Sequence, residues 1–296
     1  MNAAVEALGF GIVTASILAL ASVGFTLQFG ITNIFNLAFA NVMGLAAFAA
    51  YSLDTWTNDI WLAVVVAVFV GAAVSLMVNR LLVQPFIRRG QGAFGMIIVT
   101  FAISLLIQYA TVLVWGDGQV SYTIQQGVGG KRLLGFIFTP AQLVIVGGAV
   151  IAMGSMHILL RHTKLGKAMR ATAVNPALAG NCGIRTKRVV DVAWAVSGAL
   201  AGAAGIAFGL DTASFSAYTH QGLLVLIVAA AVLGGIGQPY GAMAGALVIG
   251  ISVELSALWI NSAYNDVIAF AILGVILLIR PRGLFGGTFS TQEMSA

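Results

Sequence analysis

The sequence predicts an all-α polytopic membrane protein with about eight or nine transmembrane helices in one domain, residues 1–296. Hydrophobic residues make up 60% of the 296 residues and charged residues only 8%, with a mean hydropathy of +1.01. A soluble domain carries about 25% charged residues. The apolar residues also fall in long runs, and about 20 in succession are needed for a helix to cross a bilayer.

Nine apolar segments are candidates for these helices. The first follows Glu6 and has no basic residues before it, so we interpret it as a retained helix rather than a cleaved signal. Residues 222–260 fit either two crossings or a re-entrant dip, because Gly234-Gly235-Ile236-Gly237 breaks a helix. The segments are approximately 8–29, 34–53, 60–83, 94–115, 139–160, 189–210, 222–236, 241–260 and 264–280.

The charges between these segments alternate in sign along the chain. Twelve of the fourteen Lys and Arg residues lie in loops that alternate with acidic ones. This is the positive-inside pattern of membrane proteins rather than a nucleic-acid-binding face, despite the net charge of +5. It predicts an outer N-terminus and an inner C-terminus. The tryptophans fit aromatic belts, with Trp56, Trp61, Trp115 and Trp259 at outer boundaries and Trp194 near an inner one.

The most polar stretch, residues 161–188, carries seven basic residues and no acid; we call it the basic segment. It is too short to bury a core of its own, so it should pack against something else. Asn175 is a good N-cap, Pro176 suits the first helical position, and Gly183 suits the position after the helix. The short helix between them is either part of an ordinary loop that sets topology or a coupling helix that inserts into a partner.

Several polar residues fall inside the predicted membrane spans, where they are costly unless they face a partner or water. Gln28, Asn33, Asn36 and Asn41 lie around the start of the second span. Asn33 and Asn36 are three residues apart and so share a helix face, whereas Asn41 points elsewhere. They either bond neighbouring helices or belong to a discontinuous helix beside a substrate path. Glu254 is the one acid deep in a predicted span.

Small residues are spaced for close helix packing in the second half of the chain. Gly198 and Gly202 are four residues apart, as are Gly241 and Gly245. In lipid, close backbone approach is what drives helix association. We favour packing within the bundle over a subunit interface.

The sequence has no energy-converting or catalytic motif. It contains no phosphate-binding loop, no metal-ligand cluster and no nucleophile–base set, so we expect no catalytic residue, cofactor or metal. The single Cys182 excludes an internal disulfide. Energy for uphill transport would have to come from a partner protein through the basic segment.

Four stretches together resemble the LivH-type inner-membrane permeases of branched-chain amino acid ABC transporters, over nearly the whole chain. They are Gly24-Phe25-Thr26-Leu27-Gln28-Phe29-Gly30 running into Asn36-Leu37-Ala38; Gly166-Lys167-Ala168-Met169-Arg170-Ala171 through Asn175 to Gly183-Ile184; Gly234-Gly235-Ile236-Gly237 with Gly241 and Gly245; and Arg280-Pro281-Arg282-Gly283-Leu284-Phe285.

The resemblance implies an ABC importer permease fold in the bacterial inner membrane. Its expected partners are two cytoplasmic ATPase subunits, a second similar permease and a periplasmic substrate-binding protein. Family members often read Asn-Phe-Ala-His-Gly-Glu in the second span, whereas Phe39, Ala40 and Asn41 stand here in place of His-Gly-Glu. The loss of charge fits an apolar amino acid as substrate.

These considerations select two sets of candidate residues. For ATPase coupling they are Lys167, Arg170, Asn175, Pro176, Ala179 and Gly183. For the translocation path they are Gln28, Asn33, Asn36, Asn41, Glu254, Gly234, Gly235 and Gly237. Two alternatives share this architecture: an importer permease for urea, amides or sugars, and a self-sufficient secondary carrier or facilitator.

Overall fold

The computed structural model describes residues 3–123, 131–133, 136–212, 214–259, 264–279 and 283–285. Helices dominate this part of the chain, together with one short antiparallel ribbon in which Arg132 pairs with Ile137. The elements are α1 (Ala3–Thr32), α2 (Phe39–Thr57), α3 (Ile60–Met77), the π-helix η1 (Val78–Val83), α4 (Gln84–Arg88), α5 (Ala93–Trp115), β1 (Lys131–Leu133), β2 (Phe136–Phe138), α6 (Pro140–His162), α7 (Lys164–Val174), α8 (Pro176–Asn181), α9 (Thr186–Asp211), α10 (Thr219–Gly234), α11 (Pro239–Ser256) and α12 (Asn265–Ile279).

The polytopic all-α prediction is confirmed. Six helical stretches in the described residues are long and apolar enough to cross a membrane, and α10 and α12 are shorter apolar helices. These eight helical stretches and α2 correspond one to one to the nine predicted apolar segments. For residues 222–260, two antiparallel helices of 16 and 18 residues meet at the turn after Gly234. At 1.5 Å per residue these helices are about 24 and 27 Å long, shorter than the roughly 30 Å hydrocarbon core.

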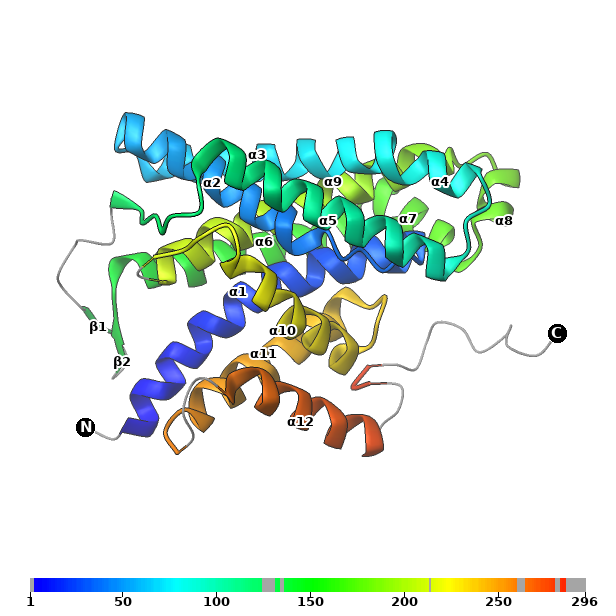
Figure 1. Ribbon diagram of the computed structural model, residues 1–296. Coiled ribbons are helices and arrows are strands. Elements are labelled where there is room, and N and C mark those ends of the chain that lie inside the picture. The colour runs from blue at the N-terminus through cyan, green and yellow to red at the C-terminus, as the bar shows by residue number, and fades with distance from the viewer. Residues whose placement is uncertain are drawn as a thin grey trace.

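Helix α1 occupies the centre of the bundle. Figure 1 shows it running obliquely between one layer that includes α2, α3, α5 and α9 and another formed by α10, α11 and α12. Residues 17–28 of α1 are buried without interruption. A helix that is apolar all round belongs in the interior of a bundle, so α1 is the element against which the others pack.

Small residues allow the closest helix contacts, and these contacts lie within the chain. Gly198 of α9 lies against Gly71 of α3, and Gly202 lies against Ala67. In the same way, Gly241 of α11 lies against Gly234 of α10, and Gly245 lies against Ala230. A Cβ atom at any of these glycines would meet backbone atoms. The predicted packing within the bundle is therefore confirmed.

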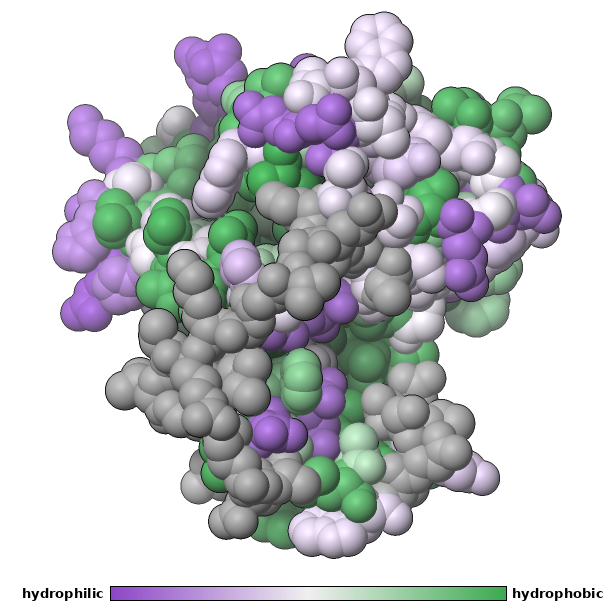
Figure 2. Space-filling view, turned by 90° about the vertical axis from the view of Figure 1, so that its left-hand side faces the viewer, coloured by the Kyte–Doolittle hydropathy of each residue, from purple (hydrophilic) through white to green (hydrophobic). Residues whose placement is uncertain are grey.

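The two ends of the bundle differ in charge. We call the end with α4, α7 and α8, at the right of Figure 1, the basic end, and the opposite end, with the N-terminus and β1, the acidic end. Basic residues at the basic end are Arg80, Arg88, Arg89, Arg161, Lys164, Lys167, Arg170, Arg185, Lys187 and Arg188, and acids at the acidic end include Glu6, Asp54, Asp59, Asp211 and Glu254. Figure 2 looks onto the acidic end, where hydrophilic side chains are spread over the surface.

Three of the predicted belt tryptophans are exposed at the acidic end: Trp56 (90%), Trp61 (64%) and Trp259 (84%). Trp115 is half-buried and donates a hydrogen bond from Nε1 to Ser52 Oγ. The prediction that Trp194 belongs to a membrane-interface belt is wrong. Its side chain is completely buried among apolar residues of α2, α5 and η1, so it is a core residue.

Candidate functional site: the basic segment and the buried polar residues

The basic segment folds back sharply after α6. Thr163 ends α6 and caps α7, because its Oγ1 accepts a hydrogen bond from Gly166 N at 3.0 Å. Gly166 lies directly against the carbonyl groups of Leu159 and Leu160, where a Cβ would have no room. A glycine at this position therefore lets α7 turn back onto the end of α6.

One face of α7 is attached to the bundle and the other is free. Met169 and Thr172 are each only 1% exposed and lie on the same face as Gly166, at a spacing of three residues. Through this face α7 contacts α1, α6 and α9. Lys167 and Arg170 lie on the exposed side. One face of the basic segment thus packs on the same chain, and its docking on another protein stays a prediction.

Helix α8 has the predicted boundaries. Asn175 Oδ1 accepts from Leu178 N at 2.9 Å, and Pro176 stands at the first helical position. After the helix, Gly183 has a φ of +83°, and Ile184 N bonds Ala179 O at 3.0 Å. This is the pattern of a helix closed by a left-handed residue. Ala179 is buried, so α8 is held on one side by a small residue.

Two apolar side chains of the basic segment are exposed on the side that does not pack against the bundle. Val174, the last residue of α7, is 66% exposed, and Leu178 of α8 is 60% exposed. They lie four residues apart, on either side of the Asn175 cap, in a segment outside the membrane-spanning helices. Exposed Lys167 and Arg170 belong to the same segment. An apolar pair within a basic surface is suited to contact with another protein.

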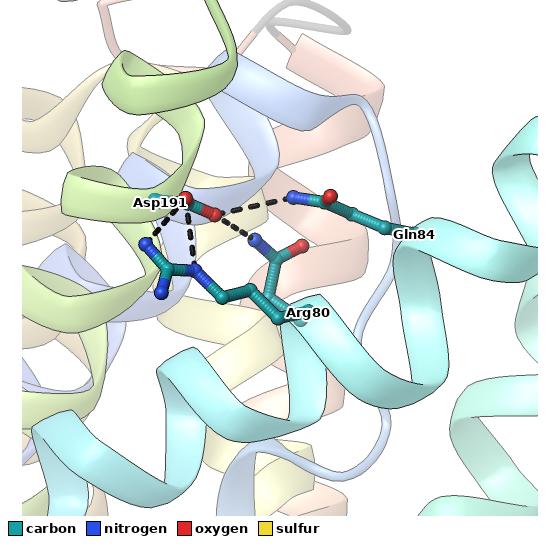
Figure 3. A network of polar contacts seen from close by, with 4 residues as sticks. Arg80, Gln84 and Asp191 are labelled. Atoms are coloured by element: carbon teal, nitrogen blue, oxygen red, sulfur yellow. Dashed lines mark hydrogen bonds and ion pairs between the residues drawn. The ribbon is translucent and has the colours of Figure 1, made fainter.

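The start of α9 is anchored by a polar network that connects it to η1 (Figure 3). The carboxylate of Asp191 accepts hydrogen bonds from Asn79 Nδ2 at 3.0 Å and from Gln84 Nε2 at 3.1 Å. It also accepts two from Arg80, from Nε at 3.0 Å and from a terminal guanidinium nitrogen at 2.8 Å. The Asp191 side chain is 9% exposed and that of Arg80 56%. A buried carboxylate is thus fully surrounded by donors.

The π-helical turn η1 makes this arrangement possible. In an α-helix, residues five apart such as Asn79 and Gln84 point about 140° away from each other. In η1 the backbone N–H of Gln84 bonds Asn79 O, five residues earlier, which turns both side chains toward the same carboxylate. This site was not predicted from the sequence, because Arg80 and Asp191 are 111 residues apart and each lies near the inner end of its own apolar segment. The available signal was an acid and a base inside two different predicted spans.

Two further polar contacts follow along the same helix. Ser75 Oγ of α3 donates to the backbone oxygen of Trp194 at 2.8 Å, and Ser197 Oγ donates to Gln28 Oε1 of α1 at 3.1 Å. With Asp191 they form a series spaced by three residues. The first turns of α9 directly follow the basic segment, so this series connects that segment to η1, α3 and α1.

The buried polar residues of the predicted path bond other parts of the bundle. Gln28 is 1% exposed and accepts from Asn36 Nδ2 at 3.4 Å as well as from Ser197. Asn41 donates from Nδ2 to Ser104 of α5, at 2.9 Å to the carbonyl and 2.6 Å to the hydroxyl. Asn41 and Gln28 thus bond neighbouring helices, which is the first of the two interpretations given for these polar residues. Their role in a translocation path stays a prediction.

The prediction that Asn33 and Asn36 share a helix face is wrong. Residues 33–38 are not helical, and Asn33 has a left-handed φ of +53° that ends α1. Asn33 is exposed, whereas Asn36 is buried and its Oδ1 accepts from Ala38 N at 3.0 Å. Residues 33–38 therefore form a non-helical connection between α1 and α2, and a discontinuous helix beside a substrate path stays a prediction.

The glycine turn between α10 and α11 meets the end of α1. Gly235 and Gly237 have φ values of +108° and +85°, and a Cβ on Gly30 would touch the backbone of Gly237.

The described C-terminal residues 283–285 pack against the same turn, at the end of α10. Leu284 N bonds Leu233 O at 2.8 Å, and Phe285 N bonds Gly234 O at 3.2 Å. These donors satisfy carbonyl groups at the end of α10. Arg280, Pro281 and Arg282, which belong to the fourth matching stretch, lie outside the described residues.

The prediction that Glu254 lies deep in a span is wrong. Helix α11 ends at Ser256, two residues after it, at the acidic end. The carboxylate is partly buried and accepts from Thr14 Oγ1 of α1 at 2.8 Å. It therefore links the outer portions of α1 and α11. In the described part of the chain, no three His, Cys, Asp or Glu side chains gather as a metal site would require.

Comparison with known proteins agrees with the helical arrangement. The family model described as "Branched-chain amino acid transport system / permease component" matches residues 7–277. The chain belongs to this permease family. It is 29% identical to the high-affinity branched-chain amino acid transport system permease protein LivH of Escherichia coli strain K12, over 93% of each chain. The chain is thus a membrane transport permease component.

Two other relatives indicate the breadth of the similarity. The chain is 30% identical to the probable branched-chain amino acid transport permease protein LivH of Methanocaldococcus jannaschii, over 93% of this chain and 90% of the relative. It is 28% identical to the fructose import permease protein FruF of Bifidobacterium longum, over 86% of this chain and 72% of the relative. No solved structure matches the chain.

Proposed function

We propose that the chain is the permease subunit of an ATP-binding cassette importer, as a single transmembrane domain that forms half of a translocation path. Its substrates are branched-chain or other hydrophobic amino acids. The relatives named for branched-chain amino acid transport match the chain over a larger share of their length than the fructose permease does. Its partners are two ATPase subunits, a second similar permease and a substrate-binding protein.

The observation that carries this proposal is the exposed apolar pair Val174 and Leu178 on the basic segment. One side of α7 is packed on α1, α6 and α9, so the free side is presented on a fixed base. The basic residues around the pair favour an acidic partner surface. The positive-inside rule puts this end, with the C-terminus, in the cytoplasm and the N-terminus in the periplasm.

The contacts of α9 can transmit a displacement caused by this partner to the other helices of the bundle. An ATPase that displaces α7 and α8 also displaces the start of α9, which directly follows them. Asp191, the Trp194 carbonyl and Ser197 then carry the displacement to η1, α3 and α1. Helix α1 ends at the same end of the bundle, where Asn33 begins a non-helical connection, so the inner end of α1 can move relative to α2.

The first test truncates the apolar pair in the complete reconstituted importer. We expect Val174→Ala with Leu178→Ala to weaken ATPase binding about thirtyfold, as loss of an interface hot spot does, and to abolish substrate-stimulated ATP hydrolysis. The matched control is Leu113→Ala, an equally apolar and 86% exposed side chain on α5. Charge reversal of Lys167 and Arg170 should have the same effect. Normal uptake by these variants would contradict the coupling role.

The alternative of a self-sufficient carrier is tested by the chain alone in liposomes. The importer proposal predicts no substrate flux without the ATPase subunits. Flux of a hydrophobic amino acid without ATP would establish the carrier instead.

The natural Cys182 tests the orientation. It is the single cysteine of the sequence, it is exposed, and it directly follows α8. A membrane-impermeant maleimide should label it in inside-out vesicles and not in intact cells, and bound ATPase should protect it. Labelling from the outside would place the basic segment outside the cytoplasm.

A further inference from the structure

A pocket of about 620 Å³ opens at the basic end, where the last turns of α6, helix α7 and the first turn of α11 meet. Its lining residues are His157 and Arg161 of α6, Arg170 of α7 and Tyr240 of α11. His157 Nδ1 and the Tyr240 hydroxyl lie 3.1 Å apart and connect α6 to α11 across the pocket. Three helices that are distant in the sequence thus contribute to one cavity.

The chemistry of the pocket selects an anion. Among the described residues, its lining includes two guanidinium groups, an imidazole and a phenol, and no carboxylate. In the part of the chain that the structure describes, the single ion pair is Arg80 with Asp191, so Arg161 and Arg170 have no acidic partner there. Two like charges around one cavity repel each other unless an anion binds between them. Arginine pairs are well suited to the oxygens of a phosphate group.

The surroundings of the pocket select a lipid over a free ion. His157 lies five residues before the end of α6, about 7.5 Å along the helix toward the bilayer. Next to it, Ile158 is 58% exposed, and Ile151, two turns further along α6, is 74% exposed. On α11, Leu247 is 49% exposed, two turns beyond Tyr240. An apolar surface therefore extends from the pocket into the membrane on both helices.

We propose that this pocket binds the phosphate group of an anionic phospholipid, with Arg161 and Arg170 as the charged ligands and the acyl chains lying along α6 and α11. The cavity has the size of a small-molecule site and accommodates a glycerophosphate headgroup. A bound headgroup would link α6, α7 and α11 and so fix the position of the basic segment relative to the bundle. The pocket shares Arg170 with the residues proposed for ATPase coupling, but lipid retention is measured on this chain without ATPase subunits, so the two proposals can fail separately.

The test measures lipid retention by the purified full-length chain with native mass spectrometry after exchange into mixed detergent and lipid. We expect the wild-type chain to retain phosphatidylglycerol at least about tenfold more strongly than phosphatidylcholine, since one charge-assisted hydrogen bond contributes about this factor. Arg161→Gln with Arg170→Gln should remove the preference. Arg188→Gln, which removes a basic residue at the same end but outside the pocket, should keep it.

A milder variant keeps the test independent of folding. Tyr240→Phe removes one hydroxyl and should lower phosphatidylglycerol retention about fivefold without a change in melting temperature. Equal retention by the double arginine variant would overturn the proposal. Displacement of lipid by inorganic phosphate, with no preference among lipids, would overturn the lipid assignment. Loss of ATPase binding with lipid retention intact would assign the pocket to the ATPase instead.

Discussion

Two buried carboxylates, at opposite ends of the bundle, show how differently the ends are built. Asp54 at the acidic end is 1% exposed and accepts from Thr123, at 2.8 Å from its N and 2.9 Å from its Oγ1. Asp191 at the basic end accepts from Asn79, Gln84 and the Arg80 guanidinium. The first holds a loop over the end of the bundle, whereas the second holds one helix to another beneath an exposed segment.

The two ends also differ in how their large side chains pack. At the acidic end, the Tyr122 hydroxyl donates to Ala47 O at 2.8 Å, and its ring lies 5.2 Å from that of Phe215. Burial, and then the charge of Asp54, raise the pKa of Tyr122, so the phenol stays a neutral donor. At the basic end, Val174 and Leu178 are exposed aliphatic side chains, whereas the large exposed side chains of the acidic end include Trp56 and Trp259. A loop of the same chain thus packs over part of the acidic end, whereas the basic segment keeps an exposed face.

The largest effect on stability is expected at the basic end. Asp191→Ala leaves Asn79, Arg80 and Gln84 without their acceptor and should reduce the free energy of unfolding by about 3 kcal/mol, the lower range for a broken buried pair because Arg80 is half exposed. Thermal unfolding in detergent measures this. Arg80→Ala should cost about 1 kcal/mol. If Arg80→Ala cost more than Asp191→Ala, the carboxylate would not be the centre of the network.

An intermediate effect is expected at the acidic end. Asp54→Ala removes the acceptor of two neutral donors from Thr123 and should cost about 2 kcal/mol. Because these bonds hold residues 116–123, amide hydrogen exchange there should rise while exchange in the basic segment stays the same. Thr123→Val keeps the backbone bond to Asp54 and should show a smaller change. A uniform rise at both ends would contradict the independence of the two regions.

The smallest effect is expected in α8. Asn175→Ala removes the side-chain acceptor for Leu178 N and should cost about 1 kcal/mol, confined to this short helix. The global melting temperature should stay unchanged, while exchange of the α8 amides and coupling to the ATPase are affected. Asn175→Asp, which retains the cap, is the matched control. A loss of global stability comparable to that of Asp191→Ala would show that α8 is part of the core.

Local features followed directly from the sequence. The limits of α8 depend on Asn175, Pro176 and Gly183, whose preferences act within a few residues. The number and order of the spans follow from apolar runs that bilayer thickness makes obligatory. In the same way, the basic and acidic ends follow from loop charges.

Contacts between residues that are distant in the sequence were not predicted correctly. The predicted positions of Trp194 at the membrane interface and of Glu254 deep in a span are wrong, because position in an apolar run does not determine which neighbour covers a side chain. The left-handed turn at Asn33 was not predicted either, although asparagine is among the residues that adopt it most readily.

The sequence by itself determined a bundle of apolar helices, its charge polarity and the capped helix of the basic segment, since these depend on composition and on neighbours along the chain. Only the tertiary structure decided that Asp191 joins Asn79 and Arg80, and that His157, Arg161, Arg170 and Tyr240 share one pocket. The physical reason is that a hydrogen bond or a cavity depends on distances between helices. Those distances are set by how the small residues of α1, α3, α9 and α11 pack, and not by the spacing of residues in the sequence.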